Sequence, residues 1–257
     1  MKGVILAGGL GTRLLPLTKV TNKHLLPVYD KPMVYYPLQA LVSAGIKEIL
    51  IVTGGAYAGE FLKLLGNGTE FALKHIHYTY QEGEGGIAAA LRLAEDFAGS
   101  DRLVVILGDN IFEDSIARFV SDYAKQEKGA KILLKEVPHP ERFGCPEIKD
   151  GKILRIIEKP KSPASKYAVT GIYFYDRQVF DVIRSLKPSG RGEMEITDVN
   201  NWYLGRGQLT YDFLKGWWTD AGTFESLLLA NTLVAQNSPL VEGCQAKPDG
   251  VFRRARL

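Results

Sequence analysis

Cysteine is scarce in this sequence, and its scarcity limits the kinds of scaffold and site that the chain can build. Only two of the 257 residues are cysteines, Cys145 and Cys244. They lie in unlike contexts, without a CxxC pair or histidines at metal-binding spacing. We therefore expect free thiols in a reducing compartment and neither a disulfide framework nor a cysteine-based metal cluster.

Long apolar runs are also missing. No stretch approaches the roughly 20 apolar residues that a membrane-spanning helix needs. The N-terminus leads directly into the pattern of a strand, without the charged and apolar regions of a signal peptide. These features predict a cytoplasmic protein that does not span a membrane.

A marked excess of one charge is absent as well. The chain has 32 Lys and Arg residues against 29 Asp and Glu residues, which is too even a balance for a general nucleic-acid-binding or membrane-binding surface. Any basic site must be local, and residues 1–31 provide one. Against Asp30 alone they carry Lys2, Arg13, Lys19, Lys23 and Lys31.

Apolar content, in contrast, is ample, because 46% of the residues are hydrophobic. Uniformly apolar runs that read as buried strands alternate in the first half with helical patterns, such as those at 32–44 and 85–97. This alternation predicts a mostly parallel sheet with helices on both faces. Strand patterns at 131–137, 152–157 and 169–175, joined by short polar turns, predict an attached antiparallel section. We expect one domain over residues 1–236 and a loosely docked tail over 237–257.

A glycine-rich loop follows the first predicted strand, Val4 to Ala7. Glycines at such a bend permit positive φ angles and leave backbone N–H groups free to surround an anion, typically a phosphate. A hydroxyl and a guanidinium come next, which suits a polyphosphate ligand. The loop residues are Gly8, Gly9, Gly11, Thr12 and Arg13.

Three other interpretations of this loop are possible. A Walker loop would end in Gly-Lys-Ser or Gly-Lys-Thr, whereas Gly11 is followed by Thr12 and Arg13. A dinucleotide-binding fingerprint needs a third glycine and a helix, but this segment runs into Pro16. The simplest alternative is a tight turn with an exposed arginine.

Two aspartates and a lysine stand where charged groups could support chemistry. Asp109 ends the apolar run 103–108, where parallel sheets bind ligands, which suggests Mg²⁺ held together with substrate phosphates. Asp220 precedes the last predicted helix, and Lys23 follows the glycine loop. Each also has an ordinary structural interpretation: a turn cap made by Asp109 or Asn110, a helix N-cap at Asp220, and an exposed side chain at Lys23.

A series of motifs in fixed order resembles the sugar-phosphate nucleotidyltransferase family, and the later motifs narrow the resemblance to its glucose-1-phosphate thymidylyltransferase branch. Several motifs in order are far more specific than one glycine loop. They span residues 1 to about 235 and comprise the glycine loop, Asn22 to Pro27, Asp30 to Met33, Tyr35 to Leu38, Gly108 to Phe112, Glu158 to Pro160, Tyr167 to Gly171, Arg191 to Glu193 and Trp218 to Thr223.

The resemblance implies the nucleotide-diphospho-sugar transferase fold, a homo-oligomer expected to be a tetramer, and a Mg²⁺-dependent reaction of dTTP with glucose 1-phosphate. It implies Arg13 and Lys23 as catalytic residues and Asp109 and Asp220 as metal ligands. The implied nucleotide-binding residues are Leu6, Ala7, Gly8, Gly9, Gly11, Thr12, Arg13, Gln81, Gly86 and Asp109. The implied sugar-phosphate-binding residues are Gly144, Glu158, Lys159, Val169, Tyr173 and Arg191.

Some alternatives stay open at this point. The same chemistry with UTP or another hexose 1-phosphate fits the motifs equally well, because a methyl group and a ribose hydroxyl separate thymidine from uridine nucleotides. A nicotinamide-dependent oxidoreductase is favoured only by the glycine loop. A non-catalytic sugar-nucleotide sensor would tolerate the loss of Arg13, Lys23 or Asp220, yet all three are present.

Overall fold

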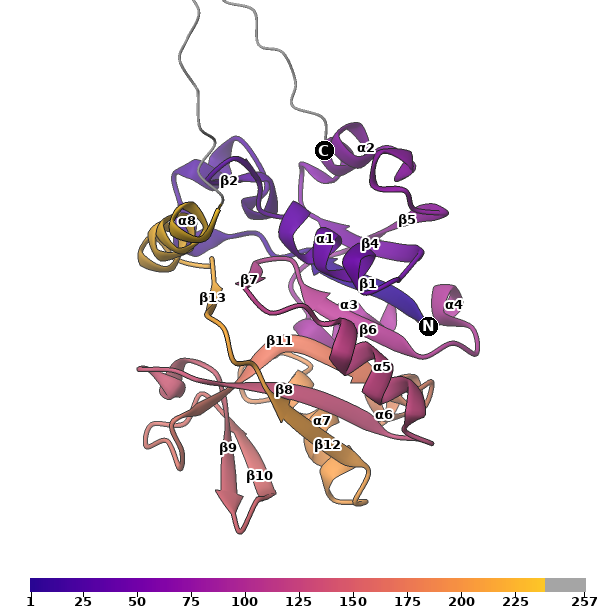
Figure 1. The fold of residues 1–257 in the computed structure, drawn as a ribbon, viewed down its shortest axis with the longest axis vertical. Coiled ribbons are helices and arrows are strands. Elements are labelled where there is room, and N and C mark those ends of the chain that lie inside the picture. The colour runs from indigo at the N-terminus through magenta and orange to yellow at the C-terminus, as the bar shows by residue number, and fades with distance from the viewer. Residues whose placement is uncertain (239–257) are drawn as a thin grey trace, which may run out of the picture.

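Seven strands form the central sheet of the computed structural model, which describes residues 1–238 (Figure 1). The strand β11 is antiparallel to both of its neighbours, β6 and β8, and the other pairings in this sheet are parallel. This confirms the predicted mixed, mostly parallel sheet. In spatial order the strands are β12 (Leu209–Phe213), β8 (Ala130–Glu136), β11 (Tyr167–Tyr175), β6 (Leu103–Leu107), β1 (Lys2–Ala7), β4 (Glu48–Gly54) and β5 (His75–Gln81).

Helices cover both faces of this sheet because its strands are apolar on both sides. Along β1, Val4 and Leu6 belong to one buried cluster and Ile5 and Ala7 to the other. The first cluster includes side chains of α3 (Ile87–Arg92), α4 (Glu95–Ala98), α6 (Val179–Ser185) and α7 (Ile196–Leu204). The second includes side chains of α1 (Tyr35–Ser43), α2 (Ala58–Leu65) and α5 (Ala117–Lys125).

Three two-stranded sheets accompany the main one. The strands β9 (Gly144–Lys149) and β10 (Lys152–Glu158) form an antiparallel hairpin, β7 (Asn110–Phe112) pairs with β13 (Trp218–Asp220), and β2 (Pro27–Val28) pairs with β3 (Lys31–Pro32). The hairpin is the antiparallel section that the sequence predicted, although β9 itself was not predicted. The predicted strands at 131–137 and 169–175 instead join the main sheet as β8 and β11.

A third, smaller core ties the two ends of the described chain together. The last helix, α8 (Phe224–Asn237), contributes Ala230 and Val234, which pack with Leu14 and Val28 from the segment after the glycine loop. Figure 1 shows α8 beside β2. This packing holds the segment before α8 close to the end of β6.

Some predicted boundaries were wrong. The helix predicted over 32–44 begins only at Tyr35, because Lys31 and Pro32 pair with β2. The helix predicted over 85–97 is split into α3 and α4, and its start moves to Ile87 because Gly86 has a φ of 88°. The predicted tail lies outside the described residues from residue 239 on.

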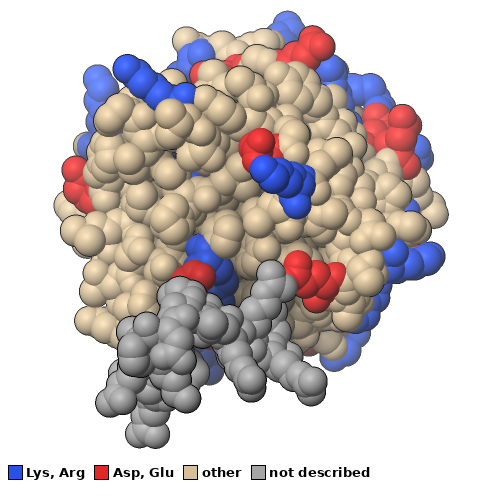
Figure 2. All heavy atoms as spheres, turned by 90° about the horizontal axis from the view of Figure 1, so that it is seen from above, with Lys and Arg blue, Asp and Glu red and all other residues tan. Residues whose placement is uncertain are grey.

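The cysteines, the helices and the surface charges can be compared with the expectations from composition. Cys145 is buried and free, as predicted, whereas Cys244 lies outside the described residues. Within residues 1–238 the helices are too short or too polar to cross a membrane. Figure 2 shows one face of the molecule, on which the charged side chains are scattered and interspersed with uncharged surface.

Candidate active site

A cavity of about 690 Å³ opens where β1 and β6 end. This volume is typical of a small-molecule site. The glycine loop, the ends of β5 and β6, the hairpin β9–β10, β11 and the segment around β13 all contribute to its wall. The charged residues that line it are Arg13, Lys23, Glu84, Asp109, Arg142, Glu158, Lys159, Glu193 and Asp220.

The glycine loop is built for close approach. A Cβ atom on Gly8 would lie 2.4 Å from Oε1 of Gln81, and one on Gly11 would lie 2.9 Å from Cβ of Lys23. Gly11 also has a φ of 69°, a left-handed conformation that glycine adopts without strain. The loop leads into a 3-10 turn, η1 (Thr12–Leu14), rather than an α-helix, which agrees with the exclusion of a dinucleotide fingerprint.

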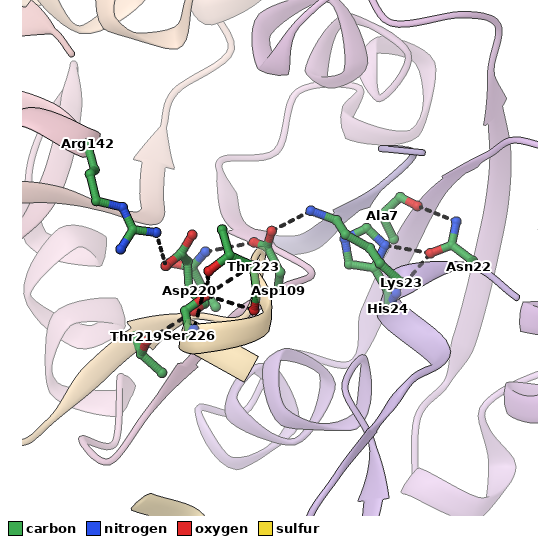
Figure 3. Close-up of polar contacts among 11 residues, drawn as sticks. Ala7, Asn22, Lys23, His24, Asp109, Arg142, Thr219, Asp220, Thr223 and Ser226 are labelled. Atoms are coloured by element: carbon green, nitrogen blue, oxygen red, sulfur yellow. Dashed lines mark hydrogen bonds and ion pairs between the residues drawn. The ribbon is translucent and has the colours of Figure 1, made fainter. Parts of the chain in front are cut away.

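The side chain of Asn22 fixes the segment that carries Lys23. Its Nδ2 atom donates to the carbonyls of Ala7 and Gly54, both at 3.5 Å, and its Oδ1 atom accepts from the backbone N–H of His24 at 2.9 Å (Figure 3). The same Oδ1 lies 2.8 Å from Nδ1 of His24, which must therefore carry the proton. Burial and the Lys23 ammonium lower the pKa of His24 to about 3, so this histidine is neutral and structural.

Lys23 and Asp109 form an ion pair inside the cavity. The Nζ atom of Lys23 lies 2.5 Å from Oδ2 of Asp109, and each side chain is only 12% exposed (Figure 3). The other carboxylate oxygen of Asp109 accepts from Nδ2 of Asn110 at 3.0 Å. Burial alone would raise the pKa of Asp109, but the Lys23 ammonium and these hydrogen bonds hold it well below its usual range. Lys23 is therefore not the exposed lysine of the alternative interpretation.

Asn110 connects the strands that bring the two aspartates together. Its Oδ1 atom accepts from the backbone N–H of Gly171 at 2.9 Å and from Nε1 of Trp218 at 2.8 Å. Asp220 pairs with Asn110 in the register of β13 on β7, and the N–H of Ala221 donates to the carbonyl of Asp109 at 2.8 Å. Two carboxylates that are 111 positions apart in the sequence therefore line one cavity.

Asp220 does not cap the helix that follows it. Thr223 and Ser226 form a capping box at the start of α8, so the N-cap interpretation of Asp220 was wrong. Its Oδ1 atom instead lies 3.9 Å from Nη2 of Arg142 (Figure 3). Burial and the Asp109 carboxylate raise the pKa of Asp220, and the Arg142 guanidinium opposes that shift.

The donor set suits a hard cation that also binds substrate. Within residues 1–238 no three His, Cys, Asp or Glu side chains gather as a complete metal cage. Asp109 and Asp220 provide carboxylate oxygens at the end of β6, and Mg²⁺ is commonly held by one or two carboxylates with water and phosphate oxygens. The residues present therefore fit Mg²⁺ and do not fit a structural zinc site.

Comparisons with known proteins agree with this geometry. Residues 2–237 match the model of the nucleotidyl transferase family. The chain belongs to the nucleotidyl transferase family.

Several similar proteins are named glucose-1-phosphate thymidylyltransferase. The protein from Mycolicibacterium smegmatis is 48% identical over 242 residues, which cover 91% of this chain and 82% of the relative. The one from Neisseria meningitidis is 46% identical over 238 residues, with the same coverage.

Solved structures show the same fold. A Bacillus anthracis protein, provisionally named glucose-1-phosphate thymidylyltransferase and crystallised with sucrose, is 56% identical. It superposes with a TM-score of 0.89 over 93% of this chain and 96% of its own. A UDP-glucose pyrophosphorylase in complex with UDP-glucose is 27% identical, with a TM-score of 0.79 over 92% of this chain and 99% of its own.

In this nucleotidyl transferase, the two residues expected to recognise the base have different neighbours: Gln81 lies next to the glycine loop, and Gly86 lies against the segment before α7. The side chain of Gln81 lies against Gly8, and it makes no hydrogen bond within residues 1–238 that would occupy its amide. Gly86 has a positive φ, and a Cβ atom there would lie 2.7 Å from the carbonyl of Met194. Glycine at this position lets the loop after β5 pack against the segment before α7.

The residues expected on the sugar side surround the open end of the β9–β10 hairpin. Gly144 pairs with Glu158, whose Oε2 atom accepts from Oγ1 of Thr197 at 2.6 Å. Lys159 follows with a φ of 43°, a strained backbone conformation for a lysine, and its N–H donates to the carbonyl of Phe143 at 3.0 Å. Strain of this kind is often found at functional sites.

Most residues predicted from the sequence line the cavity, but two do not. Ala7 lies just behind the wall, where its carbonyl accepts from Asn22. Arg191 is turned toward Glu195, to which it donates from Nε at 3.1 Å and from Nη2 at 2.9 and 2.8 Å. The lining residues among those predicted are Leu6, Gly8, Gly9, Gly11, Thr12, Arg13, Lys23, Gln81, Gly86, Asp109, Gly144, Glu158, Lys159, Val169, Tyr173 and Asp220.

Sequence reasoning missed several polar side chains of the cavity, among them Arg142, Glu193 and Thr197. Arg142 stands two residues before Gly144, Glu193 follows the Arg191 segment, and Thr197 lies in the first turn of α7. Only nearness to residues already predicted could have pointed to them. Their place in the wall depends on how the hairpin and α7 pack.

Proposed function

We propose that this protein transfers the nucleotidyl group of dTTP to glucose 1-phosphate, which gives dTDP-glucose and pyrophosphate with Mg²⁺. The observation that carries the proposal is that Lys23, Asp109 and Asp220 line one cavity. They lie there between the glycine loop and the polar residues at the open end of the β9–β10 hairpin. The names of the relatives, which are glucose-1-phosphate thymidylyltransferases, support the choice of substrates.

The glycine loop and Arg13 would hold the triphosphate. Gly8, Gly9 and Gly11 line the cavity. The Arg13 guanidinium lies near Gly222, and a Cβ atom built on Gly222 would be 3.0 Å from its Nη2 atom. Within residues 1–238 no carboxylate pairs directly with Arg13, although its charge opposes the rise in the pKa of Asp220, so its guanidinium can bind phosphate oxygens. Gly222 leaves the space that the guanidinium occupies.

The chemistry needs positioning and charge neutralisation more than proton transfer. The sugar phosphate is itself an anionic nucleophile, so one of its oxygens attacks the α-phosphorus while the bond to the bridging oxygen breaks and pyrophosphate leaves. Lys23 would neutralise charge that develops at the α-phosphate. When bound by Asp109 and Asp220, Mg²⁺ would supply Lewis-acid stabilisation of phosphate oxygens.

A pyrophosphate-release assay over a matrix of nucleoside triphosphates and sugar phosphates tests this function. We expect the highest kcat/KM with dTTP and glucose 1-phosphate, and no turnover with a chelator present. A preference for UTP or another hexose 1-phosphate would favour the alternative, which the likeness to a UDP-glucose pyrophosphorylase supports. Absence of pyrophosphate release with every pair would refute the function.

We also propose that the protein works in the cytoplasm and assembles as a homotetramer. Apolar side chains on α8 support association, because Phe224 and Leu228, one helical turn apart, are 45% and 70% exposed. Light scattering coupled to size-exclusion chromatography would give the mass of the assembly. A mass of one chain would contradict the expected oligomer.

A further inference from the structure

The carboxylate of Asp220 is largely buried in the wall of the cavity. Its side chain is 16% exposed, and within residues 1–238 neither of its oxygens accepts a hydrogen bond. Asp109 differs, because Lys23 donates to its Oδ2 atom at 2.5 Å and Asn110 donates to its Oδ1 atom at 3.0 Å. Burial of a carboxylate that lacks such donors is costly. The charge of Asp220 therefore depends on nearby cations.

Two guanidinium groups lie beside Asp220. Arg142 ends the 3-10 turn η5 (Pro140–Arg142), and its Nη2 atom is 3.9 Å from Oδ1 of Asp220 (Figure 3). Next to the other oxygen, a Cβ atom built on Gly222 would lie 3.2 Å from Oδ2 of Asp220 and 3.0 Å from Nη2 of Arg13. Burial and the Asp109 carboxylate raise the pKa of Asp220. Arg142 opposes that rise more strongly than Arg13 does, so Arg142 is the main counter-ion of Asp220.

The pairing of Arg142 with Asp220 is loose. The distance of 3.9 Å is at the outer limit for an ion pair, and the Arg142 side chain is 40% exposed. Within residues 1–238 its guanidinium donates no hydrogen bond. Arg155 on β10 shows the contrast, because its Nε atom donates to Glu147 at 2.7 Å. A half-exposed guanidinium without directed hydrogen bonds can leave its carboxylate at little cost.

A metal ion would compete with these side chains for the same two carboxylates. Lys23 contacts Asp109 directly, whereas Arg142 lies farther from Asp220 and acts on it through its charge. A divalent ion bound to Asp220 would be repelled by a guanidinium that stayed within a few ångströms, because arginine keeps its charge at physiological pH. The guanidinium therefore opposes metal binding, and it is exposed enough to move away.

We propose that Arg142 is an exchangeable counter-ion of Asp220, which Mg²⁺ displaces from that carboxylate when it binds. Arg142 is thus a positioning residue of the metal site and not a catalytic residue. It stabilises the charge of Asp220 beside Asp109, and it limits how tightly the protein binds the ion. The inference rests on the Mg²⁺ ligands of the proposed function, but it involves neither nucleotide nor sugar phosphate.

Titration of the protein with Mn²⁺ tests this role, with Arg142→Gln and Arg142→Lys as the variants. Mn²⁺ takes the same oxygen ligands as Mg²⁺, and electron paramagnetic resonance measures the unbound ion. Loss of one positive charge beside the ion should lower the Kd for Mn²⁺ about 3- to 10-fold in Arg142→Gln. Arg142→Lys keeps the charge and should stay within about twofold of wild type.

Arg155→Gln is the matched control. It removes one positive charge from the neighbouring hairpin, but Arg155 pairs with Glu147 and neither residue lines the cavity. Its Kd for Mn²⁺ should therefore match that of wild type. Salt provides a second check, because mobile ions screen exposed charges. The ratio of the Kd values of wild type and Arg142→Gln should shrink when the KCl concentration is raised.

The sign of the effect separates this role from a purely structural one. If Arg142 only supported the shape of the cavity, folded Arg142→Gln would bind Mn²⁺ more weakly than wild type, and that result would overturn the proposal. Equal Kd values in the two proteins would overturn it as well. Mn²⁺ binding that is not weakened in Asp220→Asn would also refute it. Pyrophosphate release is not measured, so failure of the proposed substrates would leave the Mn²⁺ result unchanged.

Discussion

The buried ion pair between Lys23 and Asp109 makes a quantitative prediction. Changing Lys23 to Met keeps an unbranched side chain of similar length but removes the ammonium 2.5 Å from Oδ2 of Asp109. Both side chains are 12% exposed, so the carboxylate would keep its charge in a site that excludes most water. Removing one partner of a buried pair costs about 3–5 kcal/mol of unfolding free energy.

The lower end of that range applies, because Asn110 still donates to the other oxygen of Asp109 at 3.0 Å. We expect Lys23→Met to lose about 3 kcal/mol at pH 7, which corresponds to a fall in Tm of roughly 6–12 °C for a chain of this size. The pair holds the pKa of Asp109 low. Its contribution to the free energy of unfolding is therefore complete above the unfolded pKa of about 4 and is lost as the pH falls below that value. The difference between variant and wild type should therefore shrink in acid.

Mg²⁺ should reverse part of this loss. In wild type the Lys23 ammonium already occupies Asp109, whereas in Lys23→Met the carboxylate is open to a cation. At a Mg²⁺ concentration about 100 times the Kd, binding to the folded state would restore about 2.7 kcal/mol. Thermal unfolding with and without Mg²⁺ measures both effects.

Lys131→Met is the matched control for this experiment. Lys131 pairs with Asp212 at 2.6 Å between β8 and β12, and neither residue lines the cavity. This variant should lose stability without gaining a response to Mg²⁺. An equal Mg²⁺ shift in wild type and Lys23→Met, or no loss of stability in Lys23→Met, would refute the argument.

Three further predictions concern the cavity. Gly8→Ala should raise KM for dTTP at least tenfold, because its Cβ atom would lie 2.4 Å from Oε1 of Gln81 and would displace that amide. An unchanged KM would exclude the Gln81 amide from base recognition. Asp109→Asn, Asp220→Asn and the double variant should show non-additive losses of kcat, since two ligands of one ion act as a unit; additive losses would mean that they do not share an ion. The pKa of His24 in the folded protein is about 3, below its unfolded value, so wild type loses stability as the pH falls from 6.5 to 3. His24→Asn should reduce this loss, as measured by urea unfolding at each pH.

Local sequence patterns were sufficient to predict a strand or loop where its physical cause is local. The apolar run of β1 and the glycines that follow it predicted a buried strand and a sharp loop, because a positive φ at Gly11 and missing Cβ atoms are properties of the residues themselves. The run from Leu103 to Leu107 predicted β6 for the same reason. Short strands such as β7 and β13 were missed, since three residues carry too little pattern and form only by pairing with each other.

Tertiary structure alone decided how the charges are partnered. The sequence placed Asp109 and Asp220 in the same site only by resemblance, whereas the β7–β13 pairing and the Asn110 side chain bring them to one cavity. It named Arg191 for the sugar phosphate, and in the structure that guanidinium donates to Glu195 while its Nη2 atom lies 3.6 Å from Oε1 of Glu158, a residue of the cavity wall. Arg142, which the sequence did not name, lines the cavity and lies 3.9 Å from Asp220. Which carboxylate an arginine meets depends on distances between segments far apart in the chain, and no local pattern encodes those distances.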